Sequence, residues 1–170
     1  LVLSWLMAWS FWRAEQQAAE VRFDRAASQI EAQIQTRFDR AYQSFHGVRS
    51  TMSMLGRTLR PQEYRDWMQT RFPNGDVLGM RGLGLIERIE RADLDAWIAH
   101  TRSLGRPDFR VKTSGNQPNL YVISRIEPIE RNGPALGFDV GQEAHRRAGI
   151  ESAVDTGELT LTRRIVLVQD

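Results

Sequence analysis

One uninterrupted stretch dominates the first third of this sequence. Between residues 13 and 60 it contains no proline, and its only glycines are Gly47 and Gly56. Apolar or small residues recur in steps of three and four at Phe23, Ala27, Ile30, Ile34, Phe38, Ala41, Phe45, Val48, Met52, Leu55 and Leu59. Ten steps cover these 36 residues, which gives the 3.6-residue period of a straight α-helix. The sequence therefore predicts one long helix over residues 13–60.

A helix of this length is longer than a small domain is wide. At about 1.5 Å per residue, about 48 residues reach about 70 Å. One end must therefore project, or pack against another copy of the chain. Two interpretations of the apolar stripe stay open for the first half of the helix: a parallel dimer stalk, and packing on the helix's own domain. The second half, from Phe45 to Leu59, is expected to pack on its own domain.

The first twelve residues, LVLSWLMAWSFW, are apolar except for two serines. Twelve residues cannot cross a bilayer, which takes about 20. Trp5, Trp9 and Trp12 lie near the polar boundary at Arg13, as tryptophans do at a membrane interface. We interpret residues 1–12 as the end of a transmembrane helix. A buried core helix and the end of a signal peptide are the alternatives, although no small-residue cleavage site follows.

The composition is that of a globular protein and excludes several kinds of site. Hydrophobic residues make up 41% and charged residues 26% of the 170 positions, so extensive disorder is not expected. The net charge is only +2, without blocks of like charge, which argues against a nucleic-acid partner. The absence of cysteine excludes disulfides and a cysteine nucleophile. His46, His100 and His145 have no metal-ligand spacing, and we expect neither a metal nor a cofactor.

Residues 61–170 alternate helix and strand patterns. Pro61 suits the first turn of a helix over residues 61–72, and the Pro-Asn-Gly sequence at 73–75 ends it. Strand patterns follow at 83–90, 108–113, 120–130, 135–140 and 159–168, and helices are expected at 93–104 and from the Gly-Gln break at 141–142 to Gly157. Tight turns between consecutive strands favour an antiparallel sheet covered by helices on one side. The predicted fold class is therefore α+β.

Several separate motifs in this part come in the order of a known family. They are GLGLIERI at 82–89, FRV at 109–111, and YVISRIEPIERNGPALGFDVGQEAHRRAGIESAVDTGELTLTRRIVLVQ at 121–169. Their combination resembles the CHASE domain, the extracytoplasmic sensor of bacterial membrane receptors and of plant cytokinin receptors, over about residues 60 to 169. The asparagine turn, the LGFD strand, the arginine-led helix ending in DTG and the closing strand ending in LVQ carry the resemblance.

The resemblance implies two stacked PAS-like modules carried on a long helix, usually in a dimer. The module farther from the membrane binds a small molecule against its sheet, and signals pass to a cytoplasmic histidine kinase, diguanylate cyclase or phosphodiesterase. Family members continue beyond the equivalent of Asp170, so we expect residues 61–170 to be a PAS-like module truncated at its C-terminus. The expected domains are then residues 1–12, 13–60 and 61–170, in a fragment of a tandem sensor.

Asp139 and Arg147 are the polar residues that most need an explanation. Arg147 shares a helical stripe with Ile150 and Val154, which places a cation on a face that looks buried. A buried guanidinium needs an acceptor, so we predict a structural pairing in which Asp139 or nearby carbonyls supply it. Alternatively, Arg146 or Arg147 grips an anionic ligand at the helix start. No nucleophile or base partner accompanies Asp139, and no catalytic residue is predicted.

The resemblance also provides candidate ligand-binding residues. Tyr121 matches a strand tyrosine of the cytokinin receptors, but Asn119 occupies the place of the acid that holds the adenine ring there. Asparagine offers both a donor and an acceptor, so an adenine-like ligand stays a candidate, whereas cytokinin itself is in question. Thr162 matches a threonine on the closing strand, and is otherwise an ordinary strand residue. Phe138 and Met80 are, with Tyr121, candidate apolar walls, and each is alternatively a core residue.

We therefore expect a non-catalytic sensor domain of a membrane-anchored receptor, with the sensor on the periplasmic or extracellular side of the cell (inner) membrane. Its partners would be a small-molecule ligand, the membrane, and a second copy of the chain through the stalk helix. The whole receptor would be a histidine kinase or a cyclic-di-GMP enzyme. An interaction module that senses a protein partner is one alternative. A membrane-attached hydrolase is another, and the missing nucleophile–base pair argues against it.

Overall fold

The computed structural model describes residues 2–55, 59–73 and 80–166. The chain divides into two units, residues 1–50 and residues 51–170. Helix α1 runs from Val2 to Leu55 without a break, so the predicted long helix is present and its last five residues belong to the second unit. Residues 56–58 of the predicted helix, most of the predicted break at 73–75 and residues 167–168 of the last predicted strand lie outside the described residues.

The first unit consists of helix α1, and its apolar stripe is exposed. The side chains of this stripe are between 51% and 73% exposed at Phe23, Ile30, Ile34 and Phe38. Trp5, Trp9 and Trp12 are exposed as well, and the guanidinium carbon of Arg13 lies 4.1 Å from the ring centroid of Trp9. Within the described ranges, no helix has an apolar segment long enough to cross a bilayer.

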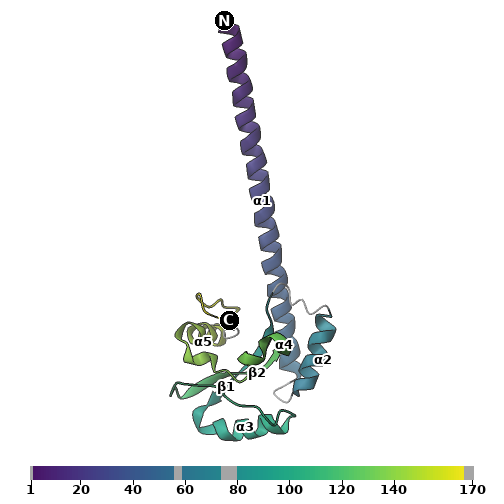
Figure 1. Ribbon diagram of the computed structural model, residues 1–170, viewed down its shortest axis with the longest axis vertical. Coiled ribbons are helices and arrows are strands. Elements are labelled where there is room, and N and C mark those ends of the chain that lie inside the picture. The colour runs from purple at the N-terminus through teal and green to yellow at the C-terminus, as the bar shows by residue number, and fades with distance from the viewer. Residues whose placement is uncertain (1, 56–58, 74–79, 167–170) are drawn as a thin grey trace. The chain divides into compact units, whose positions relative to one another are not determined.

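The second unit has an α+β fold organised around two strands (Figure 1). Strand β1 (Leu83–Glu90) pairs antiparallel with β2 (Asn119–Glu127), with an irregular register between Leu85 and Ile86. Helix α2 (Pro61–Arg71) precedes β1, and the 3-10 turn η1 (Arg91–Asp93) and helix α3 (Leu94–Ser103) connect the strands. After β2 follow α4 (Ile129–Asn132), the 3-10 turns η2 (Gly133–Ala135) and η3 (Val140–Gln142), and helix α5 (Ala144–Thr156).

The two faces of this sheet have separate cores. The core on the α3 face contains Ile89, Phe109, Leu120 and Val122, with Leu94 and Trp97 packed against them. The core on the α5 face contains Tyr121, Ile123, Ile126, Ala135 and Val140, with Phe138 and Ile150 packed against them. Residues 120–123 of β2 alternate between the two faces, as strand geometry requires. The irregular register at Leu85 and Ile86 then shifts the alternation, so that Ile126 shares a core with Ile123. Figure 1 shows α3 and α5 on opposite sides of the sheet, so the expectation that helices cover only one side was wrong.

Three of the five predicted strands are not strands in the described ranges. The β-pairing between residues 108–113 and 135–140 is an isolated bridge between Lys112 and Phe138, and residues 159–166 form no strand. Gly137 helps to explain this, because its φ is +77° and a Cβ there would lie 1.9 Å from the Arg110 carbonyl oxygen. Turns η2 and η3 bracket this contact and leave no run of extended backbone long enough for a ladder.

The ends of two predicted helices are confirmed by their local contacts. Helix α2 begins at Pro61, and the Arg60 N–H donates to Glu63 Oε2 at 2.6 Å, which satisfies one free amide of the first turn. Helix α5 ends at Gly157, whose left-handed φ of +71° lets its N–H donate to the Ala153 carbonyl at 3.0 Å. Both ends follow from local sequence alone, which is why they could be predicted.

Candidate ligand-binding site

Asp139 is an acceptor buried at the edge of the α5 face. Only 1% of the residue is exposed. Its Oδ1 accepts from the N–H groups of Tyr121 and Gly141, both at 3.0 Å, and its Oδ2 accepts from the Thr113 hydroxyl at 2.8 Å. These three donors come from β2, from η3 and from the segment after α3. Asp139 therefore joins three parts of the second unit, and its charge is matched by hydrogen bonds rather than by an ion pair.

Arg147 of α5 also bonds to the backbone of β2 and η3, close to Asp139. Its Nε donates to the Gly141 carbonyl at 2.7 Å, and its Nη2 donates to the Asn119 carbonyl at 2.8 Å. Its Nη1 pairs with Glu151 at 3.1 Å, and its guanidinium carbon lies 5.1 Å from the Tyr121 ring centroid. Carbonyl groups, which the sequence reasoning named as the alternative to Asp139, thus supply the buried acceptors of Arg147.

Gly141 is the point at which Asp139 and Arg147 meet. Its N–H donates to Asp139 and its carbonyl accepts from Arg147, so the predicted structural pair is connected through this backbone unit. A Cβ at residue 141 would lie 2.6 Å from Tyr121 Cδ2, 2.9 Å from Arg147 Nη2 and 3.1 Å from Asp139 Oδ1. No side chain larger than hydrogen fits here without displacing these groups. Within the described residues, no ion pair joins Asp139 directly to Arg147.

The structure brings some of the predicted ligand-binding residues together. Tyr121 is only 5% exposed and lies in the α5-face core, against which Phe138 packs. Burial raises the pKa of the Tyr121 hydroxyl, and the nearby Glu151 carboxylate raises it further. Asn119 is partly buried and contributes its backbone carbonyl to Arg147.

The other two predicted ligand-binding residues lie elsewhere. Thr162 is exposed on a segment without secondary structure and approaches Gly149 of α5, where an added Cβ would lie 2.9 Å from Thr162 Cγ2. Met80 is partly buried ahead of β1, and does not belong to the core that contains Tyr121. The five residues therefore do not surround one cavity in the described part of the chain. Their role in ligand binding stays a prediction.

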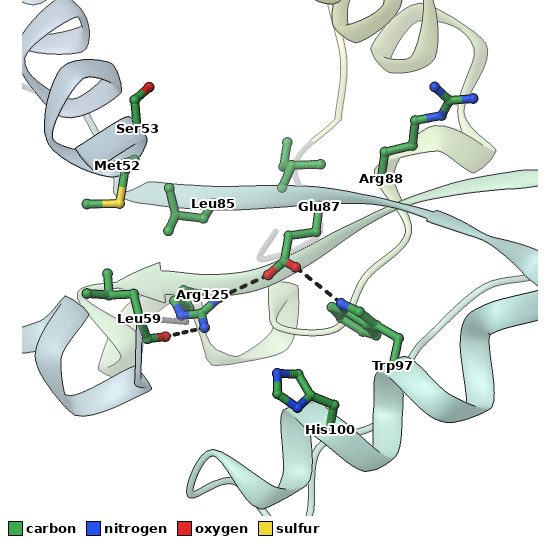
Figure 2. Close-up of a pocket in the computed structure, with 10 residues that line it drawn as sticks. Met52, Ser53, Leu59, Leu85, Glu87, Arg88, Trp97, His100 and Arg125 are labelled. Carbon is green, nitrogen blue, oxygen red and sulfur yellow. Dashed lines mark hydrogen bonds and ion pairs between the residues drawn. The ribbon is translucent and has the colours of Figure 1, made fainter. Parts of the chain in front are cut away.

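A cleft of about 550 Å³ opens instead on the α3 face (Figure 2). Its apolar walls come from the end of α1, the segment before α2, β1 and α3, through Met52, Leu59, Leu85 and Trp97. Its polar lining includes Glu87 of β1, Arg125 of β2 and His100 of α3. Its size lies within the range of small-molecule sites, and its lining combines apolar walls with an equal number of polar residues.

Glu87 connects two elements across this cleft. Its Oε1 accepts from Arg125 Nη1 at 3.0 Å, and its Oε2 accepts from Trp97 Nε1 at 3.1 Å (Figure 2). Arg125 Nη2 also donates to the Leu59 carbonyl, which ties β2 to the segment that follows α1. The Arg125 side chain is only 7% exposed, yet its Nε has no hydrogen-bond acceptor among the described residues. Such a buried N–H destabilises the fold unless an acceptor is supplied.

Sequence reasoning did not single out Glu87, Arg125 or His100. A signal was present for the first two, because GLGLIERI and LYVISRIE each place an acid and an arginine inside an apolar strand pattern. Charged residues in neighbouring strands predict a cross-strand pair. Trp97 packs on the core, edge-on to Phe109 with ring centroids 5.6 Å apart, and it also borders the cleft. His100 could not be found this way, because an exposed histidine on a short helix has no pattern of its own.

A match to a known protein family covers almost all of the second unit. The family model described as the CHASE domain matches residues 57–170. This range contains both strands, helices α2 to α5, the Asp139–Gly141–Arg147 corner and most of the lining of the cleft. No protein of the curated collection matches the chain.

Proposed function

Because this chain belongs to the CHASE domain family, whose members are non-catalytic, extracytoplasmic sensor domains of signalling receptors, we propose that its second unit binds a small molecule. Occupancy is reported through helix α1 to a cytoplasmic histidine kinase or cyclic-di-GMP enzyme. The family match over residues 57–170 is the observation that carries this function. The cleft on the α3 face supports it, since it provides a ligand-sized space next to buried polar groups.

Membrane attachment and dimerisation are parts of this proposal that rest on the first unit. The exposed tryptophans of residues 1–12 support a place at the surface of the inner membrane, with the sensor on its periplasmic or extracellular side. The exposed stripe of α1 supports a homodimer in which two stalk helices bury their apolar faces. Replacing Ile30 and Ile34 by glutamate should convert that dimer into a monomer in sedimentation velocity. A chain that sediments as a monomer before the replacement contradicts the dimer.

Each of the two faces of the sheet is a candidate position for the ligand. The family resemblance provides Asn119, Tyr121, Phe138, Thr162 and Met80 as candidate contacts, and two of them, Tyr121 and Phe138, lie in or against the α5-face core. The α3 face offers the cleft. In either position the ligand shifts the receptor only as far as it binds one arrangement of the sensor more tightly than the other.

The test is a thermal-unfolding screen of the chain with purines, organic acids and amino acids. A ligand that binds the native state raises Tm. Two variants then locate it: Leu85→Trp fills the α3-face cleft, and Phe138→Ala opens the α5-face core, each being compared with its own ligand-free Tm. A shift lost in one variant and kept in the other assigns the face. No shift with any compound contradicts small-molecule sensing.

An interaction module that senses a protein and needs no small ligand is the second candidate function. The packing of Tyr121 in the α5-face core, with Phe138 against it, favours this function, because these side chains leave little room for a ligand on that face. The same screen separates the two functions. A well-folded chain that answers to none of the compounds supports the interaction module, whereas a single saturable ligand argues against it.

A further inference from the structure

The polar groups that remain open in the α3-face cleft are hydrogen-bond donors. Both oxygens of Glu87 are already engaged, one by Arg125 and the other by Trp97. Arg125 Nε lacks an acceptor among the described residues. His100 and Ser53 also line the cleft and are exposed. A molecule that enters this space therefore meets the Arg125 guanidinium, the His100 ring and the Ser53 hydroxyl, all of which can donate, beside a carboxylate whose two oxygens each already accept a hydrogen bond. This lining favours a ligand rich in acceptors.

The charges around Arg125 also favour a ligand with hydrogen-bond acceptors, and in particular a negatively charged one. Arg65 pairs with Glu127 at 3.1 Å, and Arg125 pairs with Glu87 at 3.0 Å. Arg106 adds a third guanidinium, and its Nε is also buried without an acceptor in the described part of the chain. Burial lowers the pKa of Arg106; Glu127 raises it, and Arg65 and Arg125 lower it. Of these groups, Arg125 and Glu87 line the cleft itself, and Arg88 is the second arginine of its lining, although the Arg88 side chain is directed to the other side of β1 (Figure 2). The lining among the described residues thus has two arginines for one carboxylate, an excess of positive charge that a negatively charged ligand would balance.

The apolar residues of the cleft indicate the shape of the uncharged part of the ligand. Met52, Leu85 and Trp97 line it, and the indole of Trp97 is held in place by its hydrogen bond to Glu87 and by Phe109. A fixed indole and flexible methionine and leucine side chains suit a flat or branched apolar group. Figure 2 shows Leu85, Glu87, Trp97 and His100 around the same space, with Arg88 directed to the other side of β1.

We propose that the α3-face cleft binds a small organic acid, with Arg125 and His100 toward its carboxylate and with Met52, Leu85 and Trp97 around an apolar body about the size of one ring. This inference rests on the proposed sensor function and assigns it a ligand class. It also gives Leu59 a part in sensing, because the ligand carboxylate competes with the Leu59 carbonyl for the Arg125 guanidinium. The residues Met52 and Ser53, at the end of α1, then contact the ligand directly.

The experiment is calorimetric titration of the whole chain, residues 1–170, with benzoate, phenylacetate and indole-3-acetate, each compared with its uncharged amide. At least one acid should bind, and its amide should bind about tenfold more weakly, because the amide offers no charge to Arg125. Leu85→Trp should abolish binding by filling the cleft. His100→Ala should weaken it about fivefold through the loss of one hydrogen bond. Neither variant removes the buried Arg125, so both are expected to fold.

Arg163→Gln is the matched control, since it removes an exposed cation outside the cleft and should leave affinity unchanged. The assignment is overturned if the amides bind as tightly as the acids, if Leu85→Trp binds unchanged, or if none of the three acids binds. Should other compounds of the wider screen still raise Tm, the sensor function stands while this ligand class fails. When the entire screen is without effect, small-molecule sensing fails as well.

Discussion

The central charged residues on the two faces of the sheet differ in how their hydrogen bonds are completed. On the α5 face, Asp139 receives three hydrogen bonds and Arg147 makes three, although the buried Nε of the neighbouring Arg146 has no acceptor among the described residues. On the α3 face, Arg125 shares Glu87 with Trp97 and leaves its Nε without an acceptor in the described residues. The matched corner holds the fold together, whereas the unmatched one lies beside a cleft. An unmatched buried donor points to a ligand site only where a cleft lies beside it, as it does at Arg125.

The largest expected difference comes from removing the central charge of each face. Asp139→Ala leaves three donors without an acceptor and should lower the free energy of unfolding by about 3–5 kcal/mol. Arg125→Met should lower it by only about 1–2 kcal/mol, because the Glu87 side chain is 27% exposed and keeps its bond from Trp97. Urea unfolding measures both. Equal losses would remove the contrast between the two faces.

A smaller effect is expected from the closeness of packing around Gly141. Gly141→Ala forces a methyl group against Tyr121 and Arg147 and should destabilise the chain by about 1–3 kcal/mol. Gly115→Ala is the matched control, because no atom lies within 4 Å of the added methyl group, and it should change stability by less than about 0.5 kcal/mol. If both substitutions are neutral, the corner at Asp139 is looser than its distances indicate.

The smallest effect concerns the pH dependence of the α5 face. Glu143 caps α5 by accepting from the N–H groups of His145 and Arg146, and these bonds lower the pKa of its carboxyl below the ordinary 4.5. Its contribution to stability is therefore complete above pH 4.5 and is lost as the pH falls through the lowered folded-state pKa. Glu143→Gln should show a flatter Tm profile in that acid range than the parent chain. A Glu158→Gln variant, with the same charge change, should follow the parent.

Local patterns predicted the elements whose causes are local. The long helix, the beginning of α2 at Pro61, the end of α5 at Gly157 and strand β1 at 83–90 were all predicted from neighbouring residues. Strand β2 was predicted over 120–130 but ends at Glu127. Pro128 follows directly and has no N–H for a ladder, so the sequence contained the reason for this early end.

The missed features depend on contacts between distant residues. Whether residues 108–113 and 135–140 become strands depends on how closely Gly137 approaches Arg110, which a pattern of alternating residues does not show. The need of Arg147 for an acceptor was predictable, but the Gly141 and Asn119 carbonyls that serve it were not. The predicted buried stripe was wrong in part, because Val154 is 64% exposed and Arg146 is the more buried arginine of α5. The α3-face cleft combines side chains between Met52 and Arg125, so only the folded chain reveals it.

Gly137 also has a use in judging other sequences. Its N–H and carbonyl bond Ile123 and Lys112 on either side, so the backbone at this position is wedged between two neighbours with no room for a methyl group. A homologue with any other amino acid at the aligned position must have rebuilt the loop that carries Lys112. Glycine at this position therefore indicates that a homologue shares the present loop geometry, whereas any other residue indicates that the homologue needs a structure of its own.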